Sequence, residues 1–297
     1  MINDWLRLRT EREFQNPGLA SPTSRRFGAP ARRVTRSATG IDPSTYPTAM
    51  MSKTADTQTH CKAGMGYVAT LHVLKWRSAL GMLRALALDR FRYGNSDGLQ
   101  LLRVLGTGRG SSTAPGSQSV RTAVFALFES ETNADAFIAR VQRRRGLAES
   151  WHVKLRGAGG HGSWRGVEVP RLMGDDAAER IRRGTSPIAI ITRADVRLRS
   201  WRAFSRDARI VDTELRASRG LLAVIGIGDA PMLRLGTFSI WQNLEAMSEF
   251  GHRAPQHGRV VSRTRSERWY GEEMFARFEP YWSAGTWDGR DPLRSGS

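Results

Sequence analysis

Residues 237–278 read TFSIWQNLEAMSEFGHRAPQHGRVVSRTRSERWYGEEMFARF and carry signals for a strand, a helical region and a second strand. Residues 237–241 alternate and are rich in aromatic and β-branched side chains, a pattern that is typical of a strand. Residues 243–250 predict a short amphipathic helix, and residues 273–278 alternate again. This order of elements decides the fold, because it also occurs elsewhere in the chain.

A second helix is expected to begin at Pro255, since proline is favoured at the first helical position, where an N–H is not needed. His257 then lies in the first turn of a helix that runs to about residue 268, with Val260 and Val261 on its face. An imidazole above apolar side chains is what an axial ligand of a planar iron cofactor requires. A histidine that merely caps or packs a helix start is commoner, so the residues alone leave both roles open.

The same order of elements occurs twice, and a duplication determines the architecture. In the first half the expected strands and helices lie at 67–76, 78–91, 98–105, 121–128, 132–144 and 151–156. In the second half they lie at 188–196, 200–217, 220–227, 236–241, within 243–268, and at 273–278. Matching landmarks pair Gly106 with Gly226, Phe137 with Phe250, and Trp164 with Trp287.

Two βαββαβ units in tandem predict an α+β fold of two ferredoxin-like repeats. We expect their antiparallel sheets to lie face to face around a barrel-like interior. The first repeat is assigned to residues 65–166, the linker to 167–185 and the second repeat to 186–297. A duplicated chain satisfies internally what a single repeat obtains by dimerising, so we expect a monomer.

Residues 1–64 differ from the rest, because they are rich in Arg, Ser, Thr and Pro and show no sustained periodicity. This composition predicts disorder. Met65 directly precedes the first strand pattern, so one expectation is that translation begins there and that the extension is misassigned. A transit peptide is the rival interpretation, but Asp4, Glu11 and Glu13 argue against it.

The net charge of +18 suits nucleic acid, anionic lipid or an acidic protein partner. The arginines are scattered, and the densest run, 143–145, is typical of a solvated helix end. The one cysteine, Cys61, lies in the extension, which excludes a disulfide framework, a cysteine nucleophile and covalent haem attachment in the body. No apolar run approaches a membrane span, and we expect a cytoplasmic chain.

Other candidate motifs are weak. The Gly-rich run 106–110 is followed by a strand pattern and not by a helix, so it predicts a turn and no nucleotide site. No Ser-His-Asp set, catalytic carboxylate pair or His-Glu-x-x-His helix is present. His72 is expected to be packed in a strand. His161 lies beside Trp164, but its counterpart in the second half is Ala284, so the duplication does not support a role for it.

Several motifs together indicate a known family: the GTG turn at 106–108, TFSIW at 237–241, APQHGRVV at 254–261, WYGEEMFARF at 269–278 and GTWDGRDPL at 285–293. In their order and spacing the chain resembles the spheroidene monooxygenases, the acyclic carotenoid 2-ketolases of purple phototrophic bacteria. The resemblance covers residues 67–293 and does not include the extension 1–64, which puts the true start in doubt.

The resemblance implies a dimeric-α/β-barrel-like fold, haem iron as cofactor, and O2 with electrons from reduced ferredoxin. The family oxidises C-2 of acyclic carotenoids, spheroidene to spheroidenone, by two hydroxylations whose geminal diol loses water. His257 falls where related haem barrels carry the proximal histidine. Arg253, at the start of that segment, is expected to reach a haem propionate, although an exposed arginine is the alternative. The corresponding helix of the first half has no histidine, so we expect one iron per chain.

These implications agree with the composition. Facing sheets would offer an apolar cavity for a long polyene, and a basic surface suits an acidic ferredoxin. It also suits anionic membranes, where such a substrate resides, so peripheral membrane contact is expected. Three alternatives stay open: another barrel monooxygenase, either cofactor-free or haem-degrading, a non-catalytic protein that holds haem or an apolar ligand, and a weak, salt-dependent nucleic-acid binder.

Overall fold

The computed structural model describes residues 67–108, 120–184, 186–230, 234–253 and 270–294. The first half contains β1 (Val68–Trp76), α2 (Ala79–Tyr93), β2 (Leu99–Gly108), β3 (Arg121–Phe128), α3 (Glu131–Gln142) and β4 (Leu147–Gly162). Two short helices follow, α4 (Val169–Met173) and α5 (Ala178–Arg182). The second half contains β5 (Ile188–Val196), η1 (Leu198–Ser200), α6 (Trp201–Arg216), β6 (Leu221–Ala230), β7 (Arg234–Trp241), α7 (Leu244–Arg253) and β8 (Tyr270–Gly285).

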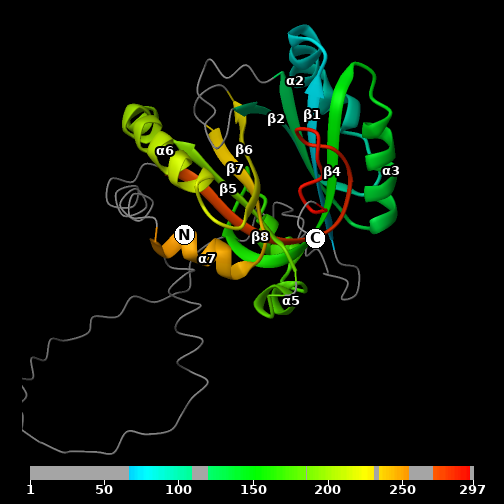
Figure 1. Cartoon of the computed structure of the whole chain (residues 1–297). Coiled ribbons are helices and arrows are strands. Elements are labelled where there is room, and N and C mark those ends of the chain that lie inside the picture. Colours follow the sequence, from blue (N-terminus) through cyan, green and yellow to red (C-terminus); the bar gives the residue numbers. More distant parts are fainter. Residues whose placement is uncertain (1–66, 109–119, 185, 231–233, 254–269, 295–297) are drawn as a thin grey trace, which may run out of the picture. The chain divides into compact units, whose positions relative to one another are not determined.

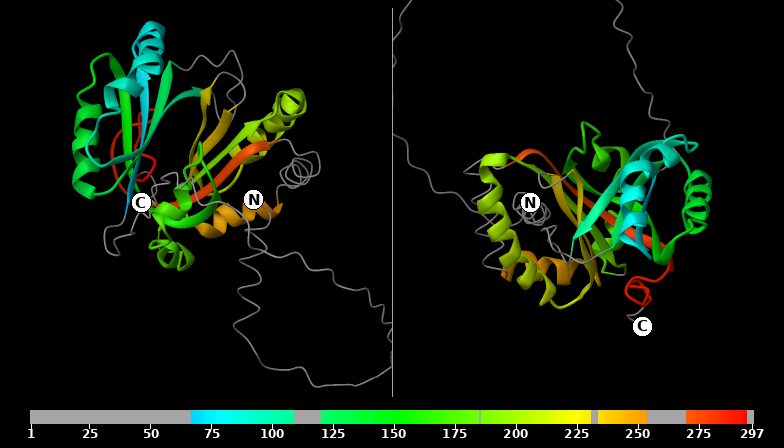
Figure 2. Two further views of the ribbon diagram at one scale, coloured as in Figure 1. Left: turned by 180° about the vertical axis from the view of Figure 1, so that it is seen from behind. Right: turned by 90° about the horizontal axis from the view of Figure 1, so that it is seen from above.

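The strands form one closed antiparallel barrel in the order β1-β3-β2-β6-β7-β5-β8-β4 (Figure 1). Within it the first half has the order β4-β1-β3-β2 and the second half the matching order β8-β5-β7-β6. Each half is therefore a ferredoxin-like unit, and the predicted α+β fold of two tandem repeats in a barrel is confirmed. Figure 2 shows the helices on the outside of this barrel.

The two sheets face each other across the barrel interior, as expected from the sequence, and they also join edge to edge, which the sequence did not predict. At one seam β2 pairs with β6 so that Thr107 lies opposite Ile227, Gly106 opposite Gly228 and Gly108 opposite Gly226. A two-fold axis through this seam would relate the halves in just this register, because each glycine then lies opposite the equivalent of the other. The register confirms that Gly106 and Gly226 are equivalent positions of the two repeats. Edge pairing is favoured because it satisfies the N–H and C=O groups that an open sheet would expose.

The second seam, between β4 and β8, is longer than the sequence predicts. The alternating patterns covered 151–156 and 273–278, whereas both strands have 16 residues. Glycines interrupt the alternation in β4, which is why the strand pattern seems to end. Gly160 has a φ of 148°, and a Cβ there would overlap the Phe275 carbonyl oxygen. Only glycine allows β4 to continue along β8 at this distance.

Side chains of the described residues fill the barrel interior. The apolar cavity that was expected between the sheets is therefore not found among the described residues. Phe125 of the first half packs on Phe278 of the second at 6.3 Å between ring centroids, and Trp151 packs on Phe238 at 6.4 Å. Both belong to one continuous cluster of buried apolar residues. An eight-stranded barrel is just wide enough for its own side chains, which is the physical reason.

Two equivalent tryptophan turns follow β4 and β8. Trp164 bridges to Val167 and Trp287 bridges to Arg290, and the residue after each tryptophan has a positive φ. The turns are held by carboxylates of the opposite half. Glu272 accepts hydrogen bonds from the backbone N–H of Gly166 and from the Ser163 hydroxyl, and Glu149 accepts from Thr286 and from the N–H of Gly289. The predicted pairing of Trp164 with Trp287 is thus confirmed.

The segment between the halves, 167–185, packs against the barrel through α4. Val169 and Met173 are buried in the interior cluster, and a Cβ at Gly157 of β4 would lie 2.5 Å from the Met173 carbonyl oxygen and 2.7 Å from the Gly174 carbonyl oxygen. The missing side chain at Gly157 is therefore what lets α4 approach the strand. Pro170 in the first turn suits the start of this short helix.

Candidate functional site

The outer faces of the two sheets differ, although their strands correspond. Thr122 lies opposite Gly106 and Leu74, and Thr237 lies opposite Gly226 and Thr192. When Gly106 is aligned with Gly226, Thr122 is therefore equivalent to Thr237 and Leu74 is equivalent to Thr192. Two residues further along these strands, Trp76 is equivalent to Ala194. A large side chain in the first half thus corresponds to a methyl group in the second.

The outer faces of the two sheets also differ in how exposed their side chains are. Leu74 and Thr122 are completely buried under α2 and α3, whereas Thr192, Val224 and Thr237 are half-buried. We call Thr192, Ala194, Val224 and Thr237 the second-sheet floor. Its side chains are small and nearly uncharged, so the surface is flat. The helices α6 and α7 lie on this outer side of the second sheet (Figures 1 and 2).

Apolar residues border the second-sheet floor. Ile190, Trp241, Met247 and Phe275 are buried in one cluster that also includes Leu215 of α6. Phe250 of α7 packs on Trp241 at 5.5 Å between ring centroids. The floor thus adjoins an apolar wall, which excludes water from one side and suits a flat, hydrophobic ligand.

His161 reaches the edge of this face because β4 continues beyond the predicted end. It lies opposite Phe275 in the β4–β8 ladder, and the two rings stack at 5.9 Å between centroids. The duplication did not support a role for His161 because its counterpart is Ala284, but the long strand β4 places it against β8 of the second half. The signal that could have found it is the glycine run 157–162, which allows the two backbones to approach.

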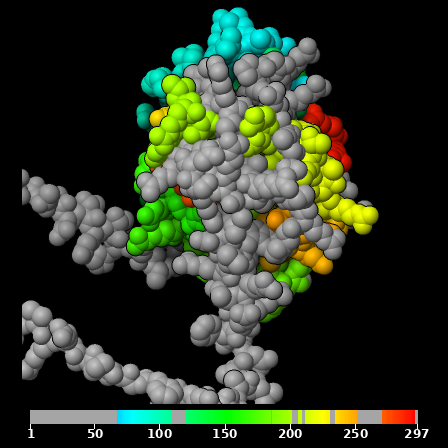
Figure 3. Space-filling model, turned by 90° about the vertical axis from the view of Figure 1, so that its left-hand side faces the viewer, coloured from blue at the N-terminus to red at the C-terminus, as the bar shows by residue number. Residues whose placement is uncertain are grey.

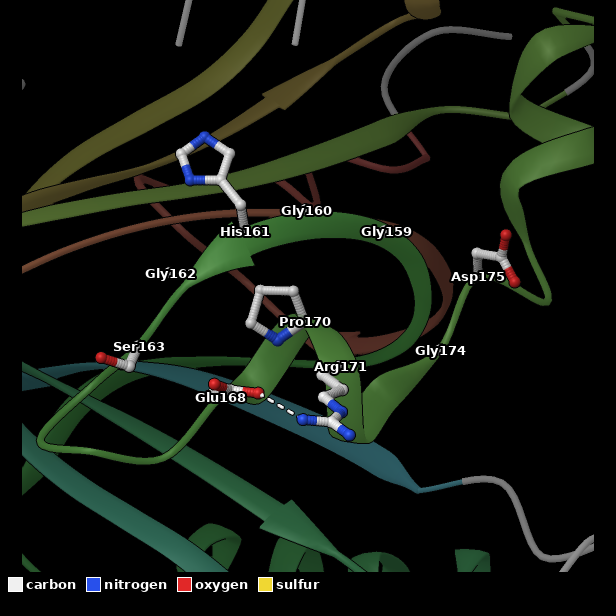
Figure 4. Close-up of a pocket in the computed structure, with 10 residues that line it drawn as sticks. All are labelled: Gly159, Gly160, His161, Gly162, Ser163, Glu168, Pro170, Arg171, Gly174 and Asp175. Carbon is white, nitrogen blue, oxygen red and sulfur yellow. Dashed lines mark hydrogen bonds and ion pairs between the residues drawn. The ribbon is translucent and has the colours of Figure 1, made fainter. Parts of the chain in front are cut away.

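A hollow of about 480 Å³ lies along the same glycine run (Figure 4). It is lined by the glycines, by His161 and Ser163 of the same segment, and by Glu168, Pro170, Arg171 and Asp175. Arg171 and Glu168 form an ion pair of 3.2 Å. Figure 4 shows His161 pointing away from these side chains. Exposed backbone and charges suit water or a polar group and not a polyene.

Two further histidines form a buried pair in the first half. The Nδ1 atoms of His72 and His152 are 2.8 Å apart, beneath the ring of Phe137. Burial lowers the pKa of His152 to about 4 and, together with the neighbouring imidazole, holds the pKa of His72 well below its usual range. Both are neutral near pH 7, and the expectation that His72 is a packed histidine is confirmed.

Within the described ranges, no group of three or more histidine, cysteine, aspartate or glutamate residues is placed so that it could hold a metal ion. Across the same ranges no helix is long and apolar enough to cross a membrane.

Comparison with known proteins now identifies the family. The chain is 33% identical over 197 residues to the spheroidene monooxygenase of Rubrivivax gelatinosus, and the match covers 65% of this chain and 73% of that relative. The chain belongs to the spheroidene monooxygenase family. A second member, from Rhodobacter capsulatus, is 26% identical over 220 residues, which are 72% of this chain and 89% of the relative. No protein-family model matches the chain.

Solved structures give more distant likenesses. An aldoxime dehydratase in complex with butyraldoxime has a TM-score of 0.48 at 10% identity, covering 73% of this chain and 80% of that one. A monooxygenase-like protein from Listeria innocua has a TM-score of 0.26 at 10% identity, covering 71% and 94%. Membership of the spheroidene monooxygenase family confirms the resemblance drawn from the motifs, and the chain is accordingly an oxidoreductase, a monooxygenase.

The site residues predicted from the spheroidene monooxygenase resemblance lie at the margin of the described chain. Arg253 is the last residue of α7. His257 lies outside the described residues, in the segment 254–269 that connects α7 to β8. Both ends of that segment belong to the second half, the half that carries the second-sheet floor. The ligand roles of His257 and Arg253 stay predictions.

Proposed function

We propose that this chain is a haem-dependent carotenoid ketolase, which introduces a keto group at C-2 of acyclic carotenoids with O2 and reduced ferredoxin. Spheroidene is the proposed substrate and spheroidenone the product. The observation that carries the proposal is the 33% identity to a relative named spheroidene monooxygenase. We further propose peripheral contact with the membrane that holds the polyene.

The second-sheet floor fits a flat cofactor. A planar macrocycle needs a surface free of large side chains. The half-buried Thr192, Val224 and Thr237, beside a buried Ala194 where the first half has Trp76, support its placement on the second half. His257 would supply a neutral nitrogen ligand to the iron, and Arg253 would supply a cation for a propionate. Haem, when bound, supplies the activation of O2. This placement gives one haem per chain, since Leu74, Trp76 and Thr122 seal the matching face of the first half.

The chain's own residues would orient the polyene and exclude water. We place the substrate end beside the second-sheet floor, against the apolar wall of Trp241 and Phe275 and within reach of His161. Each hydroxylation inserts one atom of O2 at C-2, and two electrons with two protons convert the other atom to water. After the second hydroxylation the geminal diol loses water to give the ketone.

Removing the proposed axial ligand tests the cofactor. Purified full-length protein is expected to show a Soret band, and His257→Ala is expected to lose it because the iron loses its protein nitrogen. His252→Ala, a change of the neighbouring histidine, is the matched control and should keep the band. Full haem content together with full ketolase activity in His257→Ala would refute the ligand assignment. A wild-type protein without a Soret band would favour a cofactor-free monooxygenase or an apolar-ligand binder.

Pigment analysis tests the reaction itself. Expression in a host that makes acyclic carotenoids is expected to yield 2-keto pigments, detected by their mass and by the red shift of absorption. His161→Ala should keep haem but lower the keto pigment, since the imidazole lies beside the proposed substrate space and is not the axial ligand. Unchanged pigment in cells that contain soluble, haem-loaded wild-type protein would exclude the ketolase function.

A further inference from the structure

The outward face of α2 is apolar. Its inward residues, Ala85, Asp89 and Tyr93, are buried, and helical periodicity puts the following side chains on the opposite side. These are Leu80, Leu83, Leu88 and Phe91, which are 56%, 57%, 51% and 67% exposed. A surface helix normally presents polar residues there. The neighbouring α3 does so, with Glu131, Asp135 and Arg140 exposed. In Figure 3, α2 stands out in cyan at the upper edge of the molecule.

An arginine pocket adjoins the C-terminal end of α2. This hollow of about 220 Å³ is lined by Tyr93 and by five arginines, Arg92, Arg140, Arg143, Arg144 and Arg145. Asp89 is the carboxylate nearest to them, and it is buried against Arg92 at 3.3 Å and Arg144 at 3.2 Å. Positive charge therefore far exceeds negative charge around the pocket, which favours an anion.

Unused hydrogen-bond donors line the arginine pocket. Tyr93 is only 1% exposed, yet its hydroxyl has no hydrogen-bond partner within the described part of the chain, and the same holds there for Nε of Arg144. Buried donors are normally paired. A phosphate oxygen would accept from both the hydroxyl and the guanidinium groups, in the charge-assisted geometry that arginine favours.

We propose that the outward face of α2 and the arginine pocket form one docking surface for an anionic lipid membrane. Leu80, Leu83, Leu88 and Phe91 would enter the acyl boundary, while a headgroup phosphate occupies the pocket. Arg84 lies on the same outward face between Leu80 and Leu88, and the Arg90 guanidinium lies 4.4 Å from the centroid of the Phe91 ring. Leucine and phenylalanine side chains interleaved with arginines suit the boundary between acyl chains and anionic headgroups. The inference rests on the membrane contact in the proposed function and assigns it to these residues.

Vesicle co-sedimentation of the full-length protein tests this surface. Binding to phosphatidylcholine vesicles that contain phosphatidylglycerol is expected to exceed binding to pure phosphatidylcholine and to fall with salt. Leu83→Ser combined with Phe91→Ser should weaken binding by about tenfold or more, because both inserted side chains are lost. Arg143→Gln combined with Arg145→Gln should weaken it by about tenfold on anionic vesicles alone.

Matched controls separate the surface from general effects. Leu198→Ser removes a leucine of η1 that is more exposed than those of α2. Arg171→Gln with Arg183→Gln removes two exposed arginines elsewhere. Both control variants should bind vesicles as the wild type does. If the control variants weaken binding as much as the α2 variants do, the proposal is overturned, because the positive charge of the whole protein would then account for vesicle binding. Absence of binding to anionic vesicles would overturn it outright. So would a dimer that dissociates on Phe91→Ser, because a second copy would then cover α2.

These measurements need neither haem nor carotenoid. Loss of vesicle binding with intact ketolase activity would remove only the docking surface, and intact vesicle binding without a Soret band would remove only the proposed chemistry.

Discussion

At the scale of single residues, the buried pair His72 and His152 has a defined hydrogen-bond direction. Their facing Nδ1 atoms require one imidazole to donate and the other to accept. The outer nitrogens lie 3.0 Å from the Thr70 hydroxyl and 3.1 Å from the Ser150 hydroxyl. These four side chains form a chain of hydrogen bonds that two imidazolium ions would break, because both facing Nδ1 atoms would then be donors.

The pair predicts a loss of stability in acid. Burial lowers the pKa of His152 from 6.5 to about 4. Between these two pH values the unfolded chain binds the proton more readily than the folded chain does. The stabilising effect of neutral His152 is therefore complete above pH 6.5 and is lost as the pH falls towards 4. The shift corresponds to about 3 kcal/mol in the free energy of unfolding. Urea unfolding between pH 7 and pH 4 measures it. The double variant His72→Gln with His152→Gln should show a flatter dependence of the free energy of unfolding on pH, whereas His161→Gln should leave that dependence unchanged. An equally steep dependence in the double variant would contradict the assignment of the acid loss to this pair.

At the scale of elements, the β4–β8 seam depends on glycines that have no spare space. Gly162 has a φ of 81°, and a Cβ there would overlap the Glu273 carbonyl oxygen. Gly174 has a similar φ of 67°, but nothing lies within 4 Å of its Cβ position. Both positions therefore have a positive φ that a side chain would strain, and only Gly162 adds a steric overlap with the neighbouring strand.

Alanine substitution should separate these two effects. Gly174→Ala is expected to lower the free energy of unfolding by about 1–3 kcal/mol, because φ 67° with ψ −158° is a backbone conformation that essentially only glycine adopts. Gly162→Ala should lower it further, because β4 must move away from β8. Thermal unfolding followed by circular dichroism compares the two. Equal losses would show that β4 tolerates the side chain and that the seam is looser than its geometry implies.

At the scale of the molecule, one chain closes the barrel that two chains would otherwise build. Each of the eight described strands has a neighbour on both sides, so no described strand offers an edge for pairing with a second copy. Carboxylates also cross between halves, since Glu272 and Glu149 each hold the tryptophan turn of the other. Burial opposes ionisation of Glu272, but hydrogen bonds from Gly166, Ser163, Arg193 and Arg165 lower its pKa to about 2.

The closed barrel predicts a monomer in solution. Sedimentation velocity in detergent-free buffer is expected to give the mass of one chain across a tenfold range of protein concentration, because edge pairing is already satisfied internally. A mass that doubles with concentration would contradict this expectation. Repeating the measurement with Phe91→Ser would then show whether the outward face of α2 forms the contact.

The sequence by itself determined the order of elements, the duplication and the family. Strand and helix periodicities are local, and the glycine and tryptophan landmarks survive in both halves because turns with positive φ admit few residues. The motifs around TFSIW and WYGEEMFARF were sufficient for the family. Sequence patterning also placed His72 in a packed strand, since alternation identifies the face of a strand without knowledge of its neighbours.

Only the tertiary structure decided how the halves meet and where space remains. The sheets join by their edges, the interior is filled, and the flat floor lies outside the second sheet, because Ala194 replaces Trp76 at matched positions. His161 reaches that face only because β4 continues through its glycines beside β8. Such outcomes depend on contacts between residues far apart in the chain, which periodicity within one element does not encode.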